Sequence, residues 1–247
     1  MVKPATSKPA GPPSLRLQRK QSLVLLPGAL CDAALFRHQI AGLSDIADVK
    51  VGDLTRDDSI SAMARRVLAA APPRFALAGL SLGGYVALEV MRQAADRVSR
   101  LALLGTSAEG EAGGRAEVAG AAPRVALNTP AGAMPMTSLL VHPMRLGDRR
   151  LTVILNAMAD RVGRKAFQRQ QRASLERPDS RGDLADIRCP TLLLAGRQDP
   201  LVPAAALEAM AKAIAGARLS VIEECGHLSP LEKPEAVTKA LREWLSA

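Results

Sequence analysis

The segment 75–91 (FALAGLSLGGYVALEVM) constrains the fold of this chain more than any other stretch. Residues 75–80 form a short apolar run typical of a buried strand, and from Leu82 onward apolar residues recur with a helical period. A strand that becomes a helix within three residues must bend sharply at Ser81, and side chains two positions on either side would collide there. Glycine stands at both of these positions, so the five residues match G-x-S-x-G, the nucleophile elbow. The segment therefore predicts a serine nucleophile at position 81.

Apolar runs and helical periods alternate along most of the chain. Strands are expected at 22–26, 49–54, 75–80, 101–104, 191–196 and 219–222, and helices at 36–43, 60–71, 82–95, 204–215 and 235–245. Continuous apolar strands that alternate with helices are typical of a parallel sheet covered on both faces. We therefore predict an α/β protein with a doubly wound, mostly parallel sheet.

The alternation stops between the fourth and fifth expected strands. Residues 107–188 contain helical stretches but no convincing strand, so we interpret them as a helical cap inserted between core strands. Residues 1–20 hold four prolines and five basic residues without an acidic one, which predicts a flexible basic extension. The core then consists of residues 21–106 and 189–247.

Composition argues against several classes of partner. Aromatic residues make up only 2% of the chain, too few for the stacking surfaces of proteins that bind single-stranded nucleic acid. The net charge of +9 falls to +4 without the basic extension, so we expect no nucleic-acid partner. No apolar run approaches the roughly 20 residues of a membrane span, and the N-terminus lacks the apolar stretch of a signal peptide. We expect a small-molecule substrate and no membrane partner.

The three cysteines, Cys31, Cys189 and Cys225, are an odd number without the spacing of metal ligands. Such a set is typical of reduced thiols in the cytoplasm, which is the expected location. Cys31 and Cys225 are interpreted as packed rather than reactive thiols. We expect no metal and no cofactor.

A serine nucleophile needs a general base, and the base needs an acid that orients it. Of the three histidines, only His227 directly follows an expected strand, and Asp199 stands in the turn after the strand 191–196. Open α/β sheets place their sites at these carboxyl ends of strands. We therefore predict a triad of Ser81, Asp199 and His227. The alternative for His227 is a loop histidine that only bonds to the backbone. The alternative for Asp199 is an aspartate that only forms the turn before Pro200.

An acyl-transfer site also needs two donors for the oxyanion that forms during the reaction. The backbone N–H of Leu82, at the start of the helix after the serine, is one expected donor. The loop after the first strand offers the second, with the Ala29 N–H as the expected group.

The motifs LLPGAL, GLSLGGYVAL, LLLAGRQDPLVP and CGHLSPLEKPEAV resemble those of the α/β-hydrolase fold superfamily, from about residue 22 to the C-terminus. The chain is similar in particular to small capped bacterial members near 3-oxoadipate enol-lactonases, proline iminopeptidases and carboxylesterases. The resemblance implies that Ser81 is the nucleophile, His227 the general base and Asp199 its orienting acid. The superfamily commonly has His-Gly where this chain has Pro27-Gly28, but the backbone donor lies one residue later.

The leading interpretation is a serine hydrolase that cleaves a small ester, lactone or amide through an acyl-enzyme. A lyase or C–C bond hydrolase on the same triad is one alternative. A non-enzymatic receptor for a small ligand, which retains the triad, is another. The motifs do not specify the substrate, because the superfamily hosts many reactions on one scaffold. The sequence leaves the oligomeric state open.

The cap contains a run of basic residues at helical spacing: Arg161, Arg164, Lys165, Arg169 and Arg172. This spacing predicts overlapping faces of one helix. One interpretation is a solvated helix face, and the other is that Arg169 or Arg172 binds a substrate carboxylate. Leu30, His142 and Gln170 are further expected substrate contacts.

Overall fold

The computed structural model describes residues 20–110 and 140–247, which contain a parallel sheet of six strands. The strands are β1 (Gln21–Leu26), β2 (Ala47–Val51), β3 (Phe75–Leu80), β4 (Val98–Leu104), β5 (Thr191–Gly196) and β6 (Arg218–Ile222). Their order in the sheet is β2-β1-β3-β4-β5-β6, and all five neighbouring pairs are parallel. The chain therefore winds outward from β1 in both directions, which confirms the predicted doubly wound sheet.

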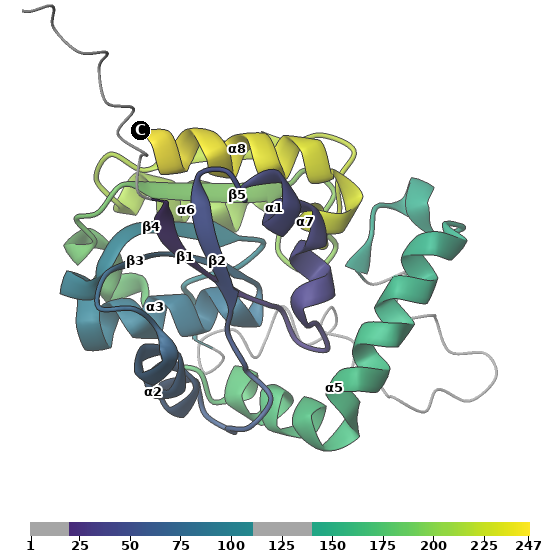
Figure 1. Cartoon of the computed structure of the whole chain (residues 1–247), viewed down its shortest axis with the longest axis horizontal. Coiled ribbons are helices and arrows are strands. Elements are labelled where there is room, and N and C mark those ends of the chain that lie inside the picture. The colour runs from purple at the N-terminus through teal and green to yellow at the C-terminus, as the bar shows by residue number, and fades with distance from the viewer. Residues whose placement is uncertain (1–19, 111–139) are drawn as a thin grey trace, which may run out of the picture.

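Helices cover both faces of the sheet (Figure 1). One face packs against η1 (Ala33–Phe36), α1 (Arg37–Gly42) and α8 (Pro234–Ser246), and the other against α2 (Ile60–Ala70), α3 (Leu82–Ala94) and α6 (Ala204–Ala213). The remaining helical elements are η2 (Ala95–Arg97), η4 (Pro143–Arg145), α5 (Arg149–Leu175), η5 (Arg181–Asp186) and α7 (Ser229–Glu232). This arrangement is the three-layer architecture expected for a chain of alternating strands and helices.

The central strands are mostly apolar because both of their faces are buried. Successive side chains of a strand point to opposite faces. Leu23 and Leu25 of β1 accordingly join the core on the α1 and α8 side, whereas Val24 and Leu26 join the core on the α2 and α3 side. All four are 4% exposed or less.

The second strand, expected at 49–54, lies earlier in the chain, at Ala47–Val51. It begins where Ala47 pairs with Gln21, the first residue of β1. It ends before Asp53, because the Asp53 carboxylate accepts the Thr55 N–H at 3.0 Å and turns the chain out of the sheet. Sheet pairing and this local turn thus override the apolar pattern.

Between β4 and β5, the described residues 140–188 contain helical elements and no strand, in agreement with a helical cap. The long element α5 bends at Gly163, which has φ 74° and ψ 163° (Figure 1). The expectation of one continuous helix for the basic run was therefore wrong: Gly163 separates Arg161 from the other four residues. The basic extension and the first part of the insertion lie outside the described residues, and the domain boundaries stay predictions.

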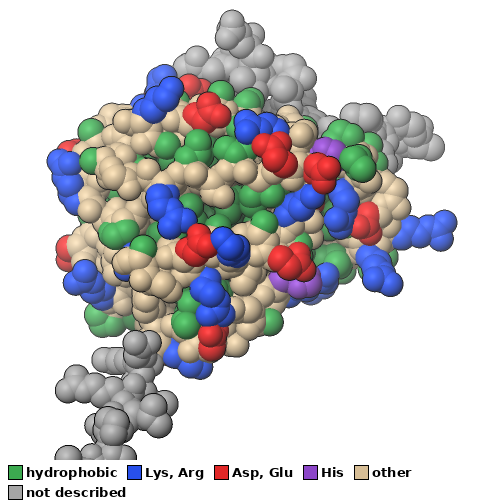
Figure 2. All heavy atoms as spheres, turned by 90° about the horizontal axis from the view of Figure 1, so that it is seen from above, with side chains coloured by type: hydrophobic (Ala, Val, Ile, Leu, Met, Phe, Trp, Pro, Cys, Tyr) green, Lys and Arg blue, Asp and Glu red, His purple; other side chains and the backbone are tan. Residues whose placement is uncertain are grey.

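Within residues 20–110 and 140–247, no helix is long and apolar enough to cross a membrane. Basic and acidic side chains are interspersed over the face that Figure 2 shows, which lies above α8. Exposed charges of the described residues often form pairs, as in the Arg242–Asp45 ion pair at 2.7 Å.

Candidate active site

Ser81 lies between β3 and α3, where the chain bends sharply. Its φ of 54° and ψ of −116° fall in a region that residues other than glycine rarely adopt. The Ser81 N–H donates to the Leu104 carbonyl at 3.0 Å, which ties the bend to β4. A Cβ at Gly79 would lie 2.2 Å from the Gly83 carbonyl oxygen, and a Cβ at Gly83 would lie 2.1 Å from the Leu26 carbonyl oxygen. The steric reason for both glycines is confirmed.

His227 and Asp199 form a buried pair. The distance from His227 Nδ1 to Asp199 Oδ2 is 2.8 Å, and the side chains are 3% and 0% exposed. The other carboxylate oxygen, Asp199 Oδ1, accepts the backbone N–H groups of Leu201 at 2.8 Å and Val202 at 3.0 Å. With Nδ1–H donated to the carboxylate, the imidazole keeps Nε2 as its acceptor. This arrangement can hold a general base in one tautomer and stabilise its protonated form.

The turn after β4 contacts both the serine and the His227–Asp199 pair. A Cβ at Gly105 would lie 3.2 Å from Asp199 Oδ2 and 3.3 Å from His227 Nδ1, so the backbone of this turn packs directly on the pair. The Thr106 hydroxyl donates to the Ser81 carbonyl at 3.0 Å. The structure therefore brings all three predicted triad residues to one edge of the sheet, in contact with the same turn.

The two expected oxyanion donors lie beside Ser81. Leu82 is the first residue of α3, and a Cβ at Gly28 would lie 3.6 Å from Ser81 Cβ, which places the loop with Ala29 next to the serine. Within the described part of the chain, neither the Ala29 N–H nor the Leu82 N–H has an acceptor. Both groups are thus available for an oxyanion, and the partial positive charge at the start of α3 favours one.

Leu30 and Gln170, two expected substrate contacts, contact each other. The Gln170 Oε1 accepts the Leu30 N–H at 3.0 Å, and the Gln170 Nε2 donates to the Leu54 carbonyl at 3.1 Å. Gln170 is fully buried, and the Leu30 side chain packs against Phe167 of the same helix. Both polar ends of the Gln170 amide are therefore occupied by backbone groups, and a direct contact with substrate stays a prediction.

His142 lies over the loop that carries His227. Its Nδ1 accepts the Met144 N–H at 3.1 Å, which caps η4, and its side chain is buried. Nearby, the Leu140 carbonyl accepts the His227 N–H at 2.9 Å and the Leu228 N–H at 3.2 Å. The cap segment 140–142 is thus bound to the histidine loop, and substrate binding by His142 stays a prediction.

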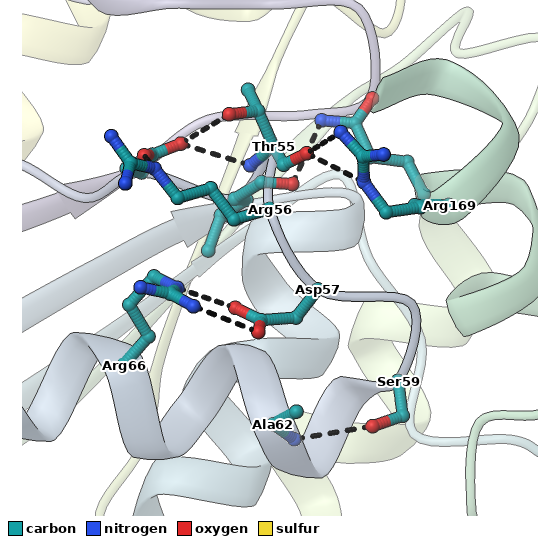
Figure 3. Close-up of polar contacts among 10 residues, drawn as sticks. Thr55, Arg56, Asp57, Ser59, Ala62, Arg66 and Arg169 are labelled. Atoms are coloured by element: carbon teal, nitrogen blue, oxygen red, sulfur yellow. Dashed lines mark hydrogen bonds and ion pairs between the residues drawn. The ribbon is translucent and has the colours of Figure 1, made fainter. Parts of the chain in front are cut away.

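Arg169 contacts the loop after β2 (Figure 3), and Arg172 pairs with a residue of the same loop. Arg169 donates from Nε and Nη2 to the Thr55 carbonyl at 2.9 and 2.7 Å, and Arg172 pairs with Asp58 at 3.1 Å. Both guanidinium groups therefore already have partners from the core. Binding of a substrate carboxylate by either one stays a prediction.

Glu232 is a residue of this site that the sequence did not point to. It lies on α7 and is 2% exposed. Its Oε1 accepts the Leu228 N–H at 3.1 Å, and its Oε2 accepts the Gly226 N–H at 3.2 Å and the His142 N–H at 2.7 Å. One carboxylate thus holds both neighbours of His227. Burial raises the pKa of Glu232 above its ordinary value, although the backbone N–H groups of His142, Gly226 and Leu228 lower it in part.

The cysteines near the site are packed, as expected. Burial raises the pKa of Cys31 to about 12, with a smaller contribution from the Asp32 carboxylate. Burial likewise raises the pKa of the Cys225 thiol. Both thiols therefore stay protonated at neutral pH and are poor nucleophiles. The described residues contain no cluster of side chains that could hold a metal ion.

Comparison with known proteins gives the family. Residues 23–240 match the model of the alpha/beta hydrolase family. A pimeloyl-[acyl-carrier protein] methyl ester esterase of Aromatoleum aromaticum is 33% identical over 200 residues, which cover 74% of this chain and 79% of that protein. A second esterase of this name, from Nitrosomonas europaea, is 28% identical and covers 72% of this chain and 74% of that protein.

Solved structures agree with the sequence comparisons. A thermophilic esterase from Thermogutta terrifontis superposes with a TM-score of 0.77 and 29% identity, covering 92% of this chain and 89% of that one. The enol-lactonase from Burkholderia xenovorans superposes with a TM-score of 0.74 at 22% identity, covers 94% of each chain, and shares the fold alone. The chain belongs to the alpha/beta hydrolase family and is an enzyme of that family.

Proposed function

We propose that this protein hydrolyses a small carboxylic ester through an acyl-enzyme formed on Ser81. The observation that carries the proposal is that the strained Ser81 and the buried His227–Asp199 pair contact the same turn, residues 105–106. A serine hydroxyl is a poor nucleophile at neutral pH, and this arrangement supplies the base and the orienting acid that it needs.

The reaction follows from these roles. His227 Nε2 takes the proton from Ser81 Oγ as the oxygen attacks the ester carbonyl carbon. The carbonyl oxygen becomes an oxyanion that the N–H groups of Ala29 and Leu82 stabilise, each by about 3–4 kcal/mol. The C–O bond to the alcohol then breaks, and His227 gives the proton to the departing alcohol. Water, activated by His227, releases the acid from Ser81 in the same way.

Relatives support an ester rather than an amide. The proteins that match over most of both chains at 28–33% identity are named methyl ester esterases, and a solved structure at 29% identity is an esterase. We therefore propose a carboxylic ester as the substrate, with methyl esters of acyl chains as the first class to assay. Lactones stay in the panel, because the same attack on a cyclic ester opens its ring without loss of an alcohol.

Labelling with a fluorophosphonate tests the activated serine. We expect an adduct of one phosphonyl group by intact mass, and none on the Ser81→Ala variant. A wild-type protein that forms no adduct would contradict the proposal. An adduct without turnover of a broad panel of esters and lactones would favour the lyase or C–C hydrolase and the receptor alternatives.

The cytoplasmic location and a small-molecule substrate are also proposals. The location rests on the three free thiols, and the substrate on the methyl ester that the names of the relatives give. Fractionation of the native host, with detection by an antibody against this protein, tests the location.

A further inference from the structure

The loop that carries Ala29 has an unusual backbone. The Cys31 N–H donates to the Gly28 carbonyl at 3.2 Å, which closes a four-residue turn, and the third residue, Leu30, has a φ of 59°. A positive φ at this position is the mark of a type II turn, where glycine or asparagine is the usual residue. Leucine lacks that freedom, so the turn is strained by about 1–3 kcal/mol.

The alternative for such a turn is a type I geometry, which most residues adopt without strain. The two forms differ by a rotation of the peptide between Ala29 and Leu30, which sends the Leu30 N–H to the opposite side. Something must therefore hold this peptide in its strained orientation.

Gln170 supplies the contact that holds it. The residue comes from the second half of α5, in the cap, and is 0% exposed. Its Oε1 accepts the Leu30 N–H at 3.0 Å, while its Nε2 is fixed on the Leu54 carbonyl at 3.1 Å. Because the amide is anchored at Leu54, it cannot turn over to donate to the Ala29 carbonyl of a rotated peptide. A rotated peptide would leave the Leu30 N–H without this partner and would bring the Ala29 carbonyl toward Gln170 Oε1, another acceptor.

We infer that Gln170 is a positioning residue that locks the Gly28–Cys31 turn and so fixes the loop from which the Ala29 N–H serves the oxyanion. The inference rests on the proposed function, because Ala29 matters only if an oxyanion forms next to it. An oxyanion donor gives its full stabilisation only when it is fixed before the reaction. The cap thus contributes to the reaction through the contact between Gln170 and the backbone N–H of Leu30.

The first test is Gln170→Met, which keeps the size of the side chain and removes its acceptor. With a neutral aryl ester, we expect kcat to fall about tenfold to a hundredfold while KM changes less than about twofold, as for a weakened oxyanion donor. The affinity for a trifluoromethyl ketone, which forms a tetrahedral adduct on the serine, should fall by a similar factor. An unchanged kcat in a folded variant would overturn the inference.

Arg169→Met separates this role from simple docking of the cap. Arg169 precedes Gln170 and donates to the adjacent carbonyl, that of Thr55 (Figure 3), but makes no hydrogen bond to the turn 28–31. The fall in kcat for Arg169→Met therefore measures the effect of looser packing of α5 on the core. We expect Gln170→Met to lower kcat at least about five times more than Arg169→Met does, and equal losses would overturn the inference.

A second pair of variants tests the strain itself. Glycine at position 30 adopts φ 59° without cost, so the turn no longer needs the lock. In a Leu30→Gly background, Gln170→Met should lower kcat less than about threefold, and a loss as large as in the wild-type background would contradict the lock. If Gln170→Met does not fold, Gln170→Glu replaces it, since a carboxyl group kept protonated by burial still accepts the Leu30 N–H and donates to the Leu54 carbonyl. We then expect kcat within about fivefold of wild type, and a hundredfold loss would overturn the inference.

Ser81→Ala in the same assay keeps the two proposals apart. If ester hydrolysis survives this change, the proposed function is wrong and the inference falls with it. If hydrolysis depends on Ser81 but not on Gln170, only the inference is wrong.

Discussion

Leu30, Ser81 and Glu224 are the non-glycine residues with positive φ in the part of the chain that the structure describes. Such backbone costs about 1–3 kcal/mol at each position and persists only where surrounding contacts enforce it. Ser81 is the proposed nucleophile, Leu30 follows a proposed oxyanion donor, and Glu224 lies in the loop that leads to His227. At the scale of single residues, strain is therefore concentrated around the candidate site.

Asp199→Asn tests the acid of the proposed triad. The amide has no charge to stabilise a protonated His227, and its NH₂ group favours the wrong tautomer. We expect kcat for an ester to fall by about 10³–10⁴-fold with the fold intact, as for loss of a triad aspartate elsewhere. Asp186→Asn, an exposed residue of η5, is the matched control and should keep full activity. A tenfold loss or less for Asp199→Asn would indicate that Asp199 serves only its turn.

At the scale of elements, the segments that carry Ser81 and His227 are held in place by contacts at the junctions between helices and strands. The first turn of α3 lies so close to the end of β1 that a side chain at Gly83 would clash with the Leu26 carbonyl. Loop 223–228 after β6 is held in a comparable way, since Glu232 at the end of α7 accepts N–H groups on both sides of His227.

Gly83→Ala tests the first junction. The new Cβ would lie 2.1 Å from a backbone oxygen, so β1 and α3 must move apart. We expect a loss of about 4 kcal/mol or more in the free energy of unfolding, measured by urea denaturation. Gly182→Ala, where nothing lies within 4 Å of the new Cβ, should change it by less than about 1 kcal/mol. Equal effects of the two changes would refute the proposed clash.

Glu232→Gln tests the second junction. An amide oxygen can accept the N–H groups on only one side, and its NH₂ group then faces a donor on the other side. We expect a loss of about 1–3 kcal/mol in stability and a Tm lower by about 3–10 °C. The exposed Glu235→Gln, in the first turn of α8, is the matched control and should lower Tm by less than about 2 °C. The same Tm for Glu232→Gln and wild type would show that the carboxylate does not hold the loop.

At the scale of the whole molecule, two thiols buried in the core link stability to pH. The pKa of Cys31 is raised to about 12 by burial, whereas an unfolded thiol has a pKa of about 8.5. The folded protein therefore binds this proton more tightly than the unfolded chain does. Its contribution to stability is complete below about pH 8.5 and is lost as the pH rises toward 12.

Urea denaturation at several pH values between about 8 and 11 measures this linkage. Above about pH 9, the free energy of unfolding should fall by an extra ~1.4 kcal/mol per pH unit for this thiol. Cys31→Ala removes the thiol, so its slope should be shallower than that of the wild type by this amount. Parallel slopes for the two proteins would show that the Cys31 pKa is not raised in the fold.

The sequence by itself was sufficient to predict the doubly wound sheet and to propose triad residues that the fold brings to one edge of that sheet. Strands, helices and the bend at Ser81 are local, because a residue's neighbours within about one turn or strand decide them. His227 and Asp199 could be found because parallel strands bring their carboxyl ends to one edge, whatever the rest of the chain does. The glycines at 79 and 83 indicate a close crossing of strand and helix by their spacing alone, because only a residue without a side chain fits there.

Only the tertiary structure decided the contacts that hold these residues in place. Gln170 meets Leu30 across 140 positions of sequence, and Glu232 meets the His142 N–H across 90 positions. In both contacts the partner is a backbone N–H, which every residue except proline carries, so no side-chain pattern marks it. Likewise, the start of β2 was fixed by its pairing with Gln21, and the bend of α5 by the positive φ of Gly163. The periodicity of a segment indicates which helix or strand it can form. Only long-range packing determines which backbone groups its side chains bond to.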